Sequence, residues 1–540
     1  MSLLSVQNLS LSIGPLPILK DVTFSIAPGE IVAVTGESGS GKSMTALAVM
    51  QLLPDSARTS GHIMLGDEEL TAQSEKALCA MRGNDVGMVF QEPMTALNPL
   101  HTIGQQVAET IRMHCILPKA EAEAQAAAML TRVGLPQDRF PLSRYPHELS
   151  GGQRQRVVIA MAIARRPRLL IADEPTTALD VTTQAKILDL LKDLVEDFDM
   201  GLLMITHDLA VVADMADRIV VMRKGEVVEQ GDTRHLLAHM QHPYTKALFA
   251  ASRHQVDLPS AEEGKTAILS VQNATRDYAL PRTKLFAPRS FHRAVKGISF
   301  DIHQGERVGL VGESGCGKST LTRAILGLEP LQDGSITAFG TAVAPDMPAQ
   351  ARIKTQVVFQ DPYSSFNPRH KVGRILTEPF HLVDTPPTRA ALTQIIGEVL
   401  SDVGLQPSDA QKYIHEFSGG QRQRIAIARA LITKPELIIF DEAVSALDVS
   451  IRAQVLDLIA ELSRRHNLAY LFISHDLSVV RSVTDRVLVM QNGEIVEQGE
   501  TETVFTTPQH PYTQTLINAA PVLPDLAALS DKTETAHAPA

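Results

Sequence analysis

The chain has 540 residues, 44% of them hydrophobic and 21% charged, a length that favours two or more domains, each with its own core. It contains no uninterrupted apolar stretch of membrane-spanning length, and Met1–Gln7 lacks the basic region of a secretory signal, so we expect a cytosolic chain. The net charge of −11 argues against a nucleic-acid-binding protein, and three scattered cysteines are too few for a disulfide framework or a zinc site.

Each half of the chain opens with predicted strands that lead into a glycine-rich loop. In the first half, alternation from Leu3 to Ser12 and a run ending in Pro28-Gly29 precede the short apolar strand Ile31 to Thr35. The second half has the same order, with strands expected at Leu269 to Asn273, Ile298 to Ile302 and Arg307 to Val311. A strand, a glycine loop and then a helix is the context in which a phosphate-loop motif is credible.

The middle of each half is predicted to be helical and then to return to buried strands. Ala120 to Val133 and Ala390 to Val403 are expected helices, and each ends in Val-Gly-Leu with proline close behind. Continuous apolar runs suit strands of a parallel sheet that is covered on both faces. Such runs occur at Leu169 to Ala172, Leu202 to Ile205, Leu437 to Phe440 and Leu471 to Ile473.

One set of motifs occurs twice, in the same order and at a nearly constant interval. A fixed long period with few gaps indicates two homologous domains rather than a solenoid. The first copy comprises Gly36, Gly39, Ser40, Gly41, Lys42, Ser43, Gln91, Ser150, Gly151, Gly152, Gln153, Asp173, Glu174, Asp180 and His207. The second comprises Gly312, Gly315, Cys316, Gly317, Lys318, Ser319, Thr320, Gln360, Ser418, Gly419, Gly420, Gln421, Asp441, Glu442, Asp448 and His475.

These motifs contain the residue types that phosphoryl transfer needs. Backbone N–H groups of Gly39 to Ser43 can wrap a phosphate at a helix N-terminus, Lys42 can reach the β- and γ-phosphates, and the Ser43 hydroxyl can ligate Mg²⁺. Lys318 and Ser319 repeat these roles.

An acid pair follows a buried strand in each copy. Asp173 and Asp441 are expected to hold Mg²⁺ directly or through water, and Glu174 and Glu442 to polarise an attacking water. The histidines His207 and His475, each after a short apolar strand, are expected to contact the γ-phosphate. Gln91 and Gln360 are further candidate ligands of the nucleotide and the metal. The Ser150-Gly-Gly and Ser418-Gly-Gly segments have the small residues of a phosphate nest, although spacing alone does not say which loop they meet.

The combination of phosphate loop, glutamine, Ser-Gly-Gly-Gln segment, acid pair and histidine resembles the ATP-binding-cassette (ABC) ATPases over nearly the whole chain. The resemblance implies an α/β fold of two tandem nucleotide-binding domains, each with a phosphate-loop core and a helical signature subdomain. It further implies an intramolecular pseudo-dimer in which each phosphate loop pairs with the signature of the other copy. Site one would join Lys42, Ser43, Gln91, Asp173, Glu174 and His207 to Ser418, Gly419, Gly420 and Asp448. Site two would join Lys318, Ser319, Gln360, Asp441, Glu442 and His475 to Ser150, Gly151, Gly152 and Asp180.

Family members also stack an aromatic side chain on adenine. Tyr278 fits that place in the second half, whereas the matching position in the first half is Ile13. This difference predicts weaker nucleotide binding at site one.

A narrower resemblance concerns the type of transporter. The segments Gln91–Pro99 and Gln360–Pro368, and His-Pro-Tyr-Thr at 242–245 and 510–513, are similar to those of the dipeptide, oligopeptide and nickel importer ATPases. The whole chain resembles their fused two-cassette form, as found in glutathione and microcin C importers. The resemblance implies two permease subunits, a solute-binding protein outside the cytoplasm and no nucleic acid as partners. It places the chain peripherally on the cytoplasmic face of the inner membrane. Many relatives carry a cysteine cluster after His-Pro-Tyr-Thr, but no cysteine follows Cys316 here, so no iron–sulfur cluster is expected.

We expect an ABC ATPase domain over residues 1–256, a polar linker over 257–266, a second domain over 267–520 and a loose tail over 521–540. The resemblance implies that the chain is the ATP-hydrolysing, energy-coupling subunit of an importer for peptides or peptide-like substrates, and two other functions remain open. A twin-cassette protein of ribosomes or DNA would usually show a long basic linker helix or cysteine-rich modules, neither of which is present. An exporter subunit is disfavoured only by the resemblance of the glutamine and His-Pro-Tyr-Thr segments to importers.

Overall fold

The computed structural model describes residues 2–91, 93–177, 179–258, 266–280, 289–361 and 365–524. The described residues form two compact units: unit 1 contains those within 1–179, 183–253 and 521–524, and unit 2 contains those within 180–182 and 254–520. Most of the expected linker lies outside the described residues, so its boundaries remain a prediction.

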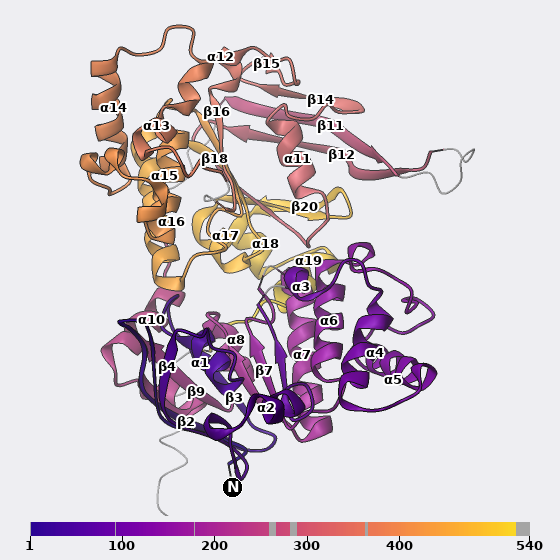
Figure 1. Cartoon of the computed structure of the whole chain (residues 1–540). Coiled ribbons are helices and arrows are strands. Elements are labelled where there is room, and N and C mark those ends of the chain that lie inside the picture. The colour runs from indigo at the N-terminus through magenta and orange to yellow at the C-terminus, as the bar shows by residue number, and fades with distance from the viewer. Residues whose placement is uncertain are drawn as a thin grey trace, which may run out of the picture. The chain divides into compact units, whose positions relative to one another are not determined.

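Unit 1 contains an antiparallel sheet, a mixed sheet and two sets of helices (Figure 1). Its elements are β1 (Leu4–Ile13), β2 (Leu16–Ile26), β3 (Ile31–Thr35), α1 (Lys42–Val49), β4 (Ala57–Leu65), β5 (Glu68–Glu69), η1 (Leu70–Ala72), α2 (Glu75–Met81), β6 (Val86–Val89), α3 (Pro93–Ala96), α4 (Ile103–His114), α5 (Lys119–Arg132), η2 (Pro146–Glu148), α6 (Gly151–Ala162), β7 (Leu169–Asp173), α7 (Val181–Phe198), β8 (Gly201–Ile205), α8 (Leu209–Met215), β9 (Arg218–Arg223), β10 (Glu226–Asp232), α9 (Thr233–Ala238) and α10 (Pro243–Ser252).

Unit 2 follows the same plan. Its elements are β11 (Ala267–Ala279), β12 (Phe291–His303), β13 (Arg307–Val311), α11 (Lys318–Ile325), β14 (Asp333–Ala338), β15 (Thr341–Ala342), α12 (Ala349–Arg352), β16 (Thr355–Val358), α13 (Val372–Leu376), η3 (Glu378–Leu382), α14 (Arg389–Asp402), η4 (Pro407–Gln411), η5 (Ile414–Glu416), α15 (Gly419–Leu431), β17 (Leu437–Asp441), α16 (Val449–His466), β18 (Ala469–Ile473), α17 (Leu477–Val483), β19 (Arg486–Gln491), β20 (Glu494–Glu500), α18 (Thr501–Thr506) and α19 (Pro511–Asn518).

The mixed sheet of each unit sets the position of the phosphate loop. Its strand order is β10-β9-β3-β8-β7-β6 in unit 1 and β20-β19-β13-β18-β17-β16 in unit 2. The strands are parallel except for the last hairpin, β9–β10 or β19–β20. Because neighbouring strands share their direction, the residues that follow β3, β7 and β8 meet at one edge of the sheet.

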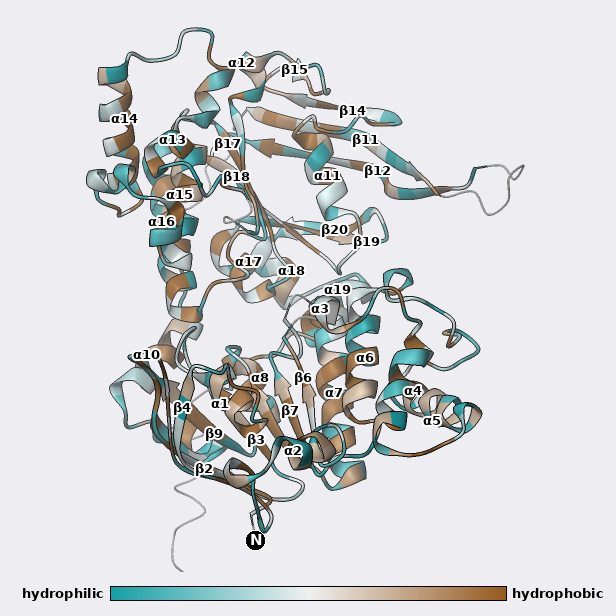
Figure 2. Ribbon diagram, viewed as in Figure 1, coloured by the Kyte–Doolittle hydropathy of each residue, from teal (hydrophilic) through white to brown (hydrophobic). Residues whose placement is uncertain are grey.

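Every residue of β3, β7 and β8 is buried, as the continuous apolar runs predict. Alternate residues of these strands belong to two different cores of unit 1. Ala33 and Leu202 face the core that includes α4 to α7, whereas Val32 and Leu203 face the core shared with the antiparallel sheet and α1. Figure 2 shows these central strands predominantly in the hydrophobic colour. The sheet is therefore covered on both faces.

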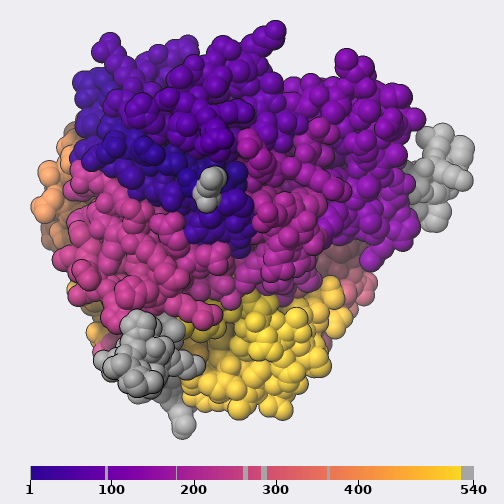
Figure 3. Space-filling view, turned by 90° about the horizontal axis from the view of Figure 1, so that it is seen from below, coloured from indigo at the N-terminus to yellow at the C-terminus, as the bar shows by residue number. Residues whose placement is uncertain are grey.

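The helical subdomain of unit 1 packs through α4, α5 and α6, which lie side by side (Figure 1). Helix α4 begins with a capping box in which Thr102 and Gln105 bond each other's backbone N–H groups. An ion pair links the antiparallel sheet of unit 1 to its mixed sheet: Lys20 of β2 lies 2.9 Å from Glu226 of β10. Figure 3 shows these indigo and magenta segments side by side on the surface.

Candidate nucleotide site

The phosphate loops have the strand-loop-helix arrangement that the motif predicts. In unit 1 the loop joins β3 to α1, and Gly36, Gly39 and Gly41 all have positive φ angles of 147°, 75° and 103°. A Cβ atom on Gly36 would lie 2.2 Å from the carbonyl oxygen of Met222. A side chain is therefore excluded at Gly36 by both space and conformation.

Each loop lysine is buried and bonded to its own loop. The Nζ of Lys42 donates to the carbonyl oxygens of Gly36 at 2.8 Å and Glu37 at 2.9 Å. The Nζ of Lys318 makes the equivalent bonds, at 2.7 and 2.9 Å. The ammonium groups are thus held next to the loop backbone, where the phosphates of a bound nucleotide are expected.

The candidate metal ligands of unit 1 lie together. Ser43, at the start of α1, donates its hydroxyl to Asp173 Oδ1 at 3.2 Å. Burial, together with the neighbouring Glu174 carboxylate, raises the pKa of Asp173. In unit 2, burial and Glu442 likewise raise the pKa of Asp441. Each unit therefore places two adjacent carboxylates in a poorly solvated setting that favours a cation.

Glu174 is held by three side chains. It accepts hydrogen bonds from Gln91 at 2.9 Å and Thr177 at 2.8 Å, and its other oxygen lies 3.1 Å from Nδ1 of His207. Burial opposes ionisation, but the bond and charge of His207, the Thr177 hydroxyl and Lys42 together lower the pKa of Glu174 to about 2. The structure thus brings the predicted glutamine, glutamate and histidine together, and adds Thr177, which the motif reading did not select.

The corresponding glutamate of unit 2 has fewer partners. Glu442 lies 3.6 Å from Nδ1 of His475, and the nearness and charge of this histidine lower the pKa of the carboxyl despite burial. Ser445 occupies the place of Thr177, but it donates to the main-chain oxygen of Glu442 at 2.9 Å. Gln360 donates to Ser445 at 3.4 Å, and among the described residues no hydrogen bond joins Gln360 to the carboxylate. The two carboxylates therefore differ in support.

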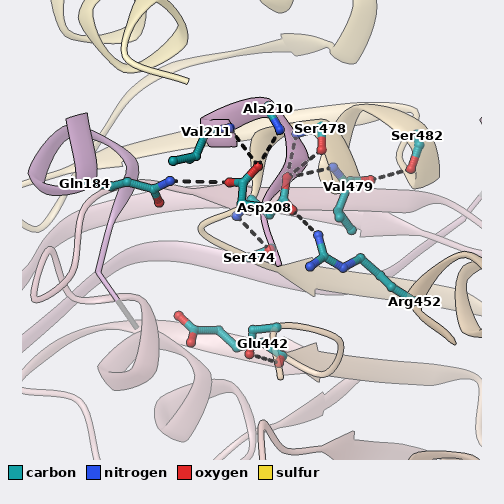
Figure 4. A network of polar contacts seen from close by, with 12 residues as sticks. Gln184, Asp208, Ala210, Val211, Glu442, Arg452, Ser474, Ser478, Val479 and Ser482 are labelled. Carbon is teal, nitrogen blue, oxygen red and sulfur yellow. Dashed lines mark hydrogen bonds and ion pairs between the residues drawn. The ribbon is translucent and has the colours of Figure 1, made fainter. Parts of the chain in front are cut away.

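The residue after each histidine fixes the following helix. Asp208 accepts from the N–H groups of Ala210 and Val211 and from Gln184 of α7 at 3.4 Å (Figure 4). In unit 2, Asp476 caps α17 in the same way and also accepts from Arg452 of α16 at 2.6 Å. Burial would raise the pKa of Asp476, but Arg452, Ser478 and the capping bonds lower it.

The Ser-Gly-Gly-Gln segments begin helices α6 and α15. Ser150 and Gln153 form a capping box, and Ser418 and Gln421 repeat it. The two glycines of each segment differ: a Cβ on Gly152 would lie 2.2 Å from Thr183, whereas Gly151 is exposed and meets nothing closer than 3.7 Å. The second copy repeats this contrast, with Gly420 crowded by Ile451 and Gly419 open. Close packing therefore explains why the second position of each segment is glycine. At the first position the backbone is not crowded in this way and stays accessible. Asp180 accepts from Thr182 at 2.9 Å, and Asp448 is the N-cap residue of α16.

Tyr278 lies beside the phosphate-loop helix of unit 2. Its hydroxyl is 3.4 Å from Oγ1 of Thr320 and donates to Glu329 at 2.5 Å, and the Arg276 guanidinium covers its ring at 4.9 Å. In unit 1, Met44 stands at the place of Thr320. This difference between the two copies can be seen in the sequence, directly after the motif residues Ser43 and Ser319, although the motifs alone give it no significance.

Cys316 is the thiol within the second loop. It is buried, its Sγ lies 3.9 Å from Nζ of Lys318, and burial raises the pKa of the thiol.

The fold and this arrangement define a phosphate-loop ATPase with two nucleotide-binding units. Comparison with known protein families gives the rest: residues 19–177 and 295–445 match the ABC transporter family, and residues 228–289 and 496–539 match the oligopeptide/dipeptide transporter C-terminal region. The chain belongs to the ABC transporter family, and it is an ATPase of the ABC type whose domains bind ATP.

Two relatives show how far the likeness extends. The peptidoglycan transport ATP-binding protein YejF of Agrobacterium fabrum is 45% identical over 527 residues, which cover 96% of each chain. The glutathione import ATP-binding protein GsiA of Shigella dysenteriae is 45% identical over 564 residues, covering 96% of this chain and 90% of the relative. Among solved structures, the cassette MJ0796 bound to ADP and phosphate is 24% identical and covers 43% of this chain and 98% of its own, with a TM-score of 0.39. In the part of the chain that the structure describes, no helix has the length and apolar character needed to cross a bilayer.

Proposed function

We propose that this chain is the ATP-hydrolysing, energy-coupling subunit of an importer for peptides or peptide-like substrates. The observation that carries the proposal is the match of both copies to the oligopeptide/dipeptide transporter C-terminal region, within relatives that are 45% identical over 96% of the chain. One relative's name assigns it glutathione import and another's peptidoglycan transport; glutathione is a tripeptide and peptidoglycan carries short peptides, which supports a peptide-like substrate.

Mg²⁺ fits the residues of each unit. Hydroxyl and carboxylate oxygens suit this ion, which usually takes one or two carboxylates together with substrate phosphates. Ser43, Gln91 and Asp173 would hold it in unit 1, and Ser319, Gln360 and Asp441 in unit 2. The raised pKa values of Asp173 and Asp441 support this role, because a cation would relieve the repulsion between each aspartate and the glutamate beside it.

The chain's own residues divide the work around the nucleotide. Lys42 and Lys318 neutralise β- and γ-phosphate charge, and His207 and His475 approach the γ-phosphate. With a pKa of about 2, Glu174 is a poor proton acceptor at neutral pH. Its role in this proposal is therefore to orient and polarise the attacking water as a fixed anion. The pairing of each phosphate loop with the other copy's Ser-Gly-Gly segment stays a prediction of the family resemblance.

The partners in this proposal are two permease subunits and, through them, a solute-binding protein outside the cytoplasm. The segments after Gln91 and Gln360 would contact cytoplasmic loops of the permeases, which places the chain peripherally at the inner membrane. Near the first segment, Leu100 is 81% exposed and Met113 is 77% exposed.

The test is ATP-driven uptake in vesicles that contain this chain with the permeases encoded beside it. The expected result is that the neighbouring solute-binding protein, loaded with a di- or tripeptide or glutathione, stimulates both ATP hydrolysis and uptake. Transport of substrate only from the cytoplasmic side to the opposite side of the membrane would identify an exporter. Co-purification of the chain with ribosomes or DNA, without permeases, would reject transport altogether.

A further inference from the structure

The His-Pro-Tyr-Thr segments, known from the sequence only as a mark of importer type, reach the phosphate loops. In unit 1, the backbone N–H of Glu37 donates to the hydroxyl oxygen of Tyr244 at 3.0 Å. In unit 2, the N–H of Glu313 donates to Tyr512 at the same distance. Both tyrosines are buried, at 7% and 8% exposure. The contact therefore occurs in both copies, between residues about two hundred positions apart.

The peptide group that each tyrosine holds is the one that also holds the loop lysine. The carbonyl of Gly36 accepts from Nζ of Lys42 at 2.8 Å, and the N–H of the same Gly36–Glu37 peptide donates to Tyr244. A peptide group is planar, so fixing the direction of the N–H also fixes the direction of the carbonyl. The tyrosine thus determines where the acceptor of the lysine lies.

The tyrosine is itself fixed by the turn that precedes it. Glu229 of β10 accepts from the N–H groups of Gln241 and His242 at 2.7 and 3.2 Å, and Nδ1 of His242 accepts from the N–H of Tyr244 at 3.1 Å. The Arg223 guanidinium covers the Tyr244 ring at 4.8 Å.

The second copy repeats the turn. Glu497 accepts from the N–H groups of Gln509 and His510 at 2.8 and 3.0 Å, and His510 accepts from Tyr512 at 3.2 Å. A carboxylate, a histidine and a tyrosine therefore form one connected support behind each loop. The side chain of Glu497 has a lowered pKa, because these backbone bonds and Thr513 outweigh its burial.

We infer that Tyr244 and Tyr512 are positioning residues for ATP binding, which orient Lys42 and Lys318 through the first peptide of each phosphate loop. The inference rests on the proposed role of these lysines at the β- and γ-phosphates. It gives the His-Pro-Tyr-Thr segment a task inside the ATPase unit. No contact with the permeases is needed for this task.

The decisive variant is Tyr512→Phe, measured in the full chain with Lys42→Ala so that only unit 2 reports. The ring stays and only the hydroxyl acceptor is lost. We expect ATP and ADP to bind about tenfold more weakly, a change of about 1.4 kcal/mol, while AMP binding stays the same because AMP has no β- or γ-phosphate. The matched control is Tyr470→Phe. Tyr470 is fully buried in the same unit, and its hydroxyl donates to the carbonyl of Val483; Tyr470 pairs with Arg307 at the start of β13, whereas the loop follows the end of that strand.

A double-mutant cycle with Lys318→Arg, which keeps the positive charge, separates positioning from general stability. If the tyrosine acts through the lysine, the losses in ATP affinity caused by Tyr512→Phe and Lys318→Arg are not additive, and the double variant loses less than the sum of the two. Additive losses, an equal loss for AMP, or an equal loss in Tyr470→Phe overturns the inference.

The same measurements distinguish a failure of the proposed lysine role from a failure of the tyrosine inference. If Lys318→Ala binds ATP as tightly as the parent chain, the assignment of the lysine fails; if only Tyr512→Phe is silent, the inference alone fails. Tyr244→Phe with Lys318→Ala gives an independent measurement on unit 1. If neither phenylalanine variant folds, the tyrosines serve stability only, and the inference is wrong.

Discussion

The two units are expected to bind adenine nucleotides with unequal strength, because the side chains beside their phosphate loops differ. Tyr278 of unit 2 lies 3.4 Å from Thr320 in the first turn of α11. Ile13 and Met44 are the corresponding residues of unit 1. Replacing Tyr278 with alanine should therefore bring unit 2 towards the affinity of unit 1.

The structure sets the size of this effect. Stacking of a base on an aromatic ring contributes about 1–3 kcal/mol, which corresponds to about 5-fold to 150-fold in affinity. The Tyr278 ring is held by Arg276 on one face and by Glu329 at its hydroxyl. Little ordering of the ring is then required when the base binds, so we expect about a tenfold loss or more for Tyr278→Ala.

The assay is equilibrium ATP binding to two full-length proteins, each with one working loop and no hydrolysis. Lys42→Ala with Glu442→Gln reports on unit 2, and Lys318→Ala with Glu174→Gln reports on unit 1. Unit 2 should bind more tightly, and Tyr278→Ala should remove most of the difference. The control Tyr278→Phe keeps the ring and should stay close to the parent. Equal affinity in the two parent proteins, or no change in Tyr278→Ala, would refute the reasoning.

Three further predictions concern individual groups. Thr177→Val removes a hydrogen bond to an ionised carboxylate, worth about 1.5–3 kcal/mol. This change should raise the pKa of Glu174 and slow ATP hydrolysis, with little change in ATP affinity. A parallel fall in hydrolysis rate and ATP affinity, or no change in either, contradicts this. The raised thiol pKa of Cys316 predicts slow alkylation that accelerates at high pH and is blocked by ATP, as measured by mass spectrometry of the modified residue. Asp476, whose pKa is lowered in the fold, stabilises unit 2 above its unfolded pKa of about 3.9 and loses that contribution as the pH falls through the lower folded value. Arg452→Leu should therefore speed amide exchange at the start of α17 at neutral pH, and unchanged exchange would count against the ion pair.

Much of the fold could be predicted from the sequence, because its signals are local. The apolar runs Leu169 to Ala172 and Leu202 to Ile205 lie in strands of the mixed sheet and are fully buried. A strand whose residues are all apolar is stable where both faces of a parallel sheet are covered. The expected helix over Ala120 to Val133 begins one residue earlier, at Lys119, and ends at Arg132. The expected strand at Leu269 to Asn273 is longer, extending over Ala267–Ala279.

The supporting contacts of the site could not be predicted in the same way. The glutamate, glutamine and histidine of unit 1 belong to motifs, and the structure brings them together at Glu174. Thr177 and Ser445 are both small hydroxyl residues, yet one bonds a carboxylate and the other a main-chain oxygen. That choice depends on side-chain direction, which the sequence does not specify.

The contact between Tyr244 and Glu37 shows what a repeat can and cannot reveal. Nothing in the spacing joins these residues, because they are 207 positions apart and only the folded unit brings α10 to the loop. Yet the two copies agree in the carboxylate, histidine and tyrosine of this support and in the loop lysine, whereas they differ at the residues beside the base and at the donors to the glutamate. Because phosphate positioning is the part that both copies retain, both units should remain competent to hold the phosphates of ATP. The differences then act on how tightly the base is held and how well the water-orienting carboxylate is supported. On this reasoning, exchanging Thr177 and Ser445 between the copies should alter the hydrolysis rates of the two units, and should leave their ATP affinities in the original order.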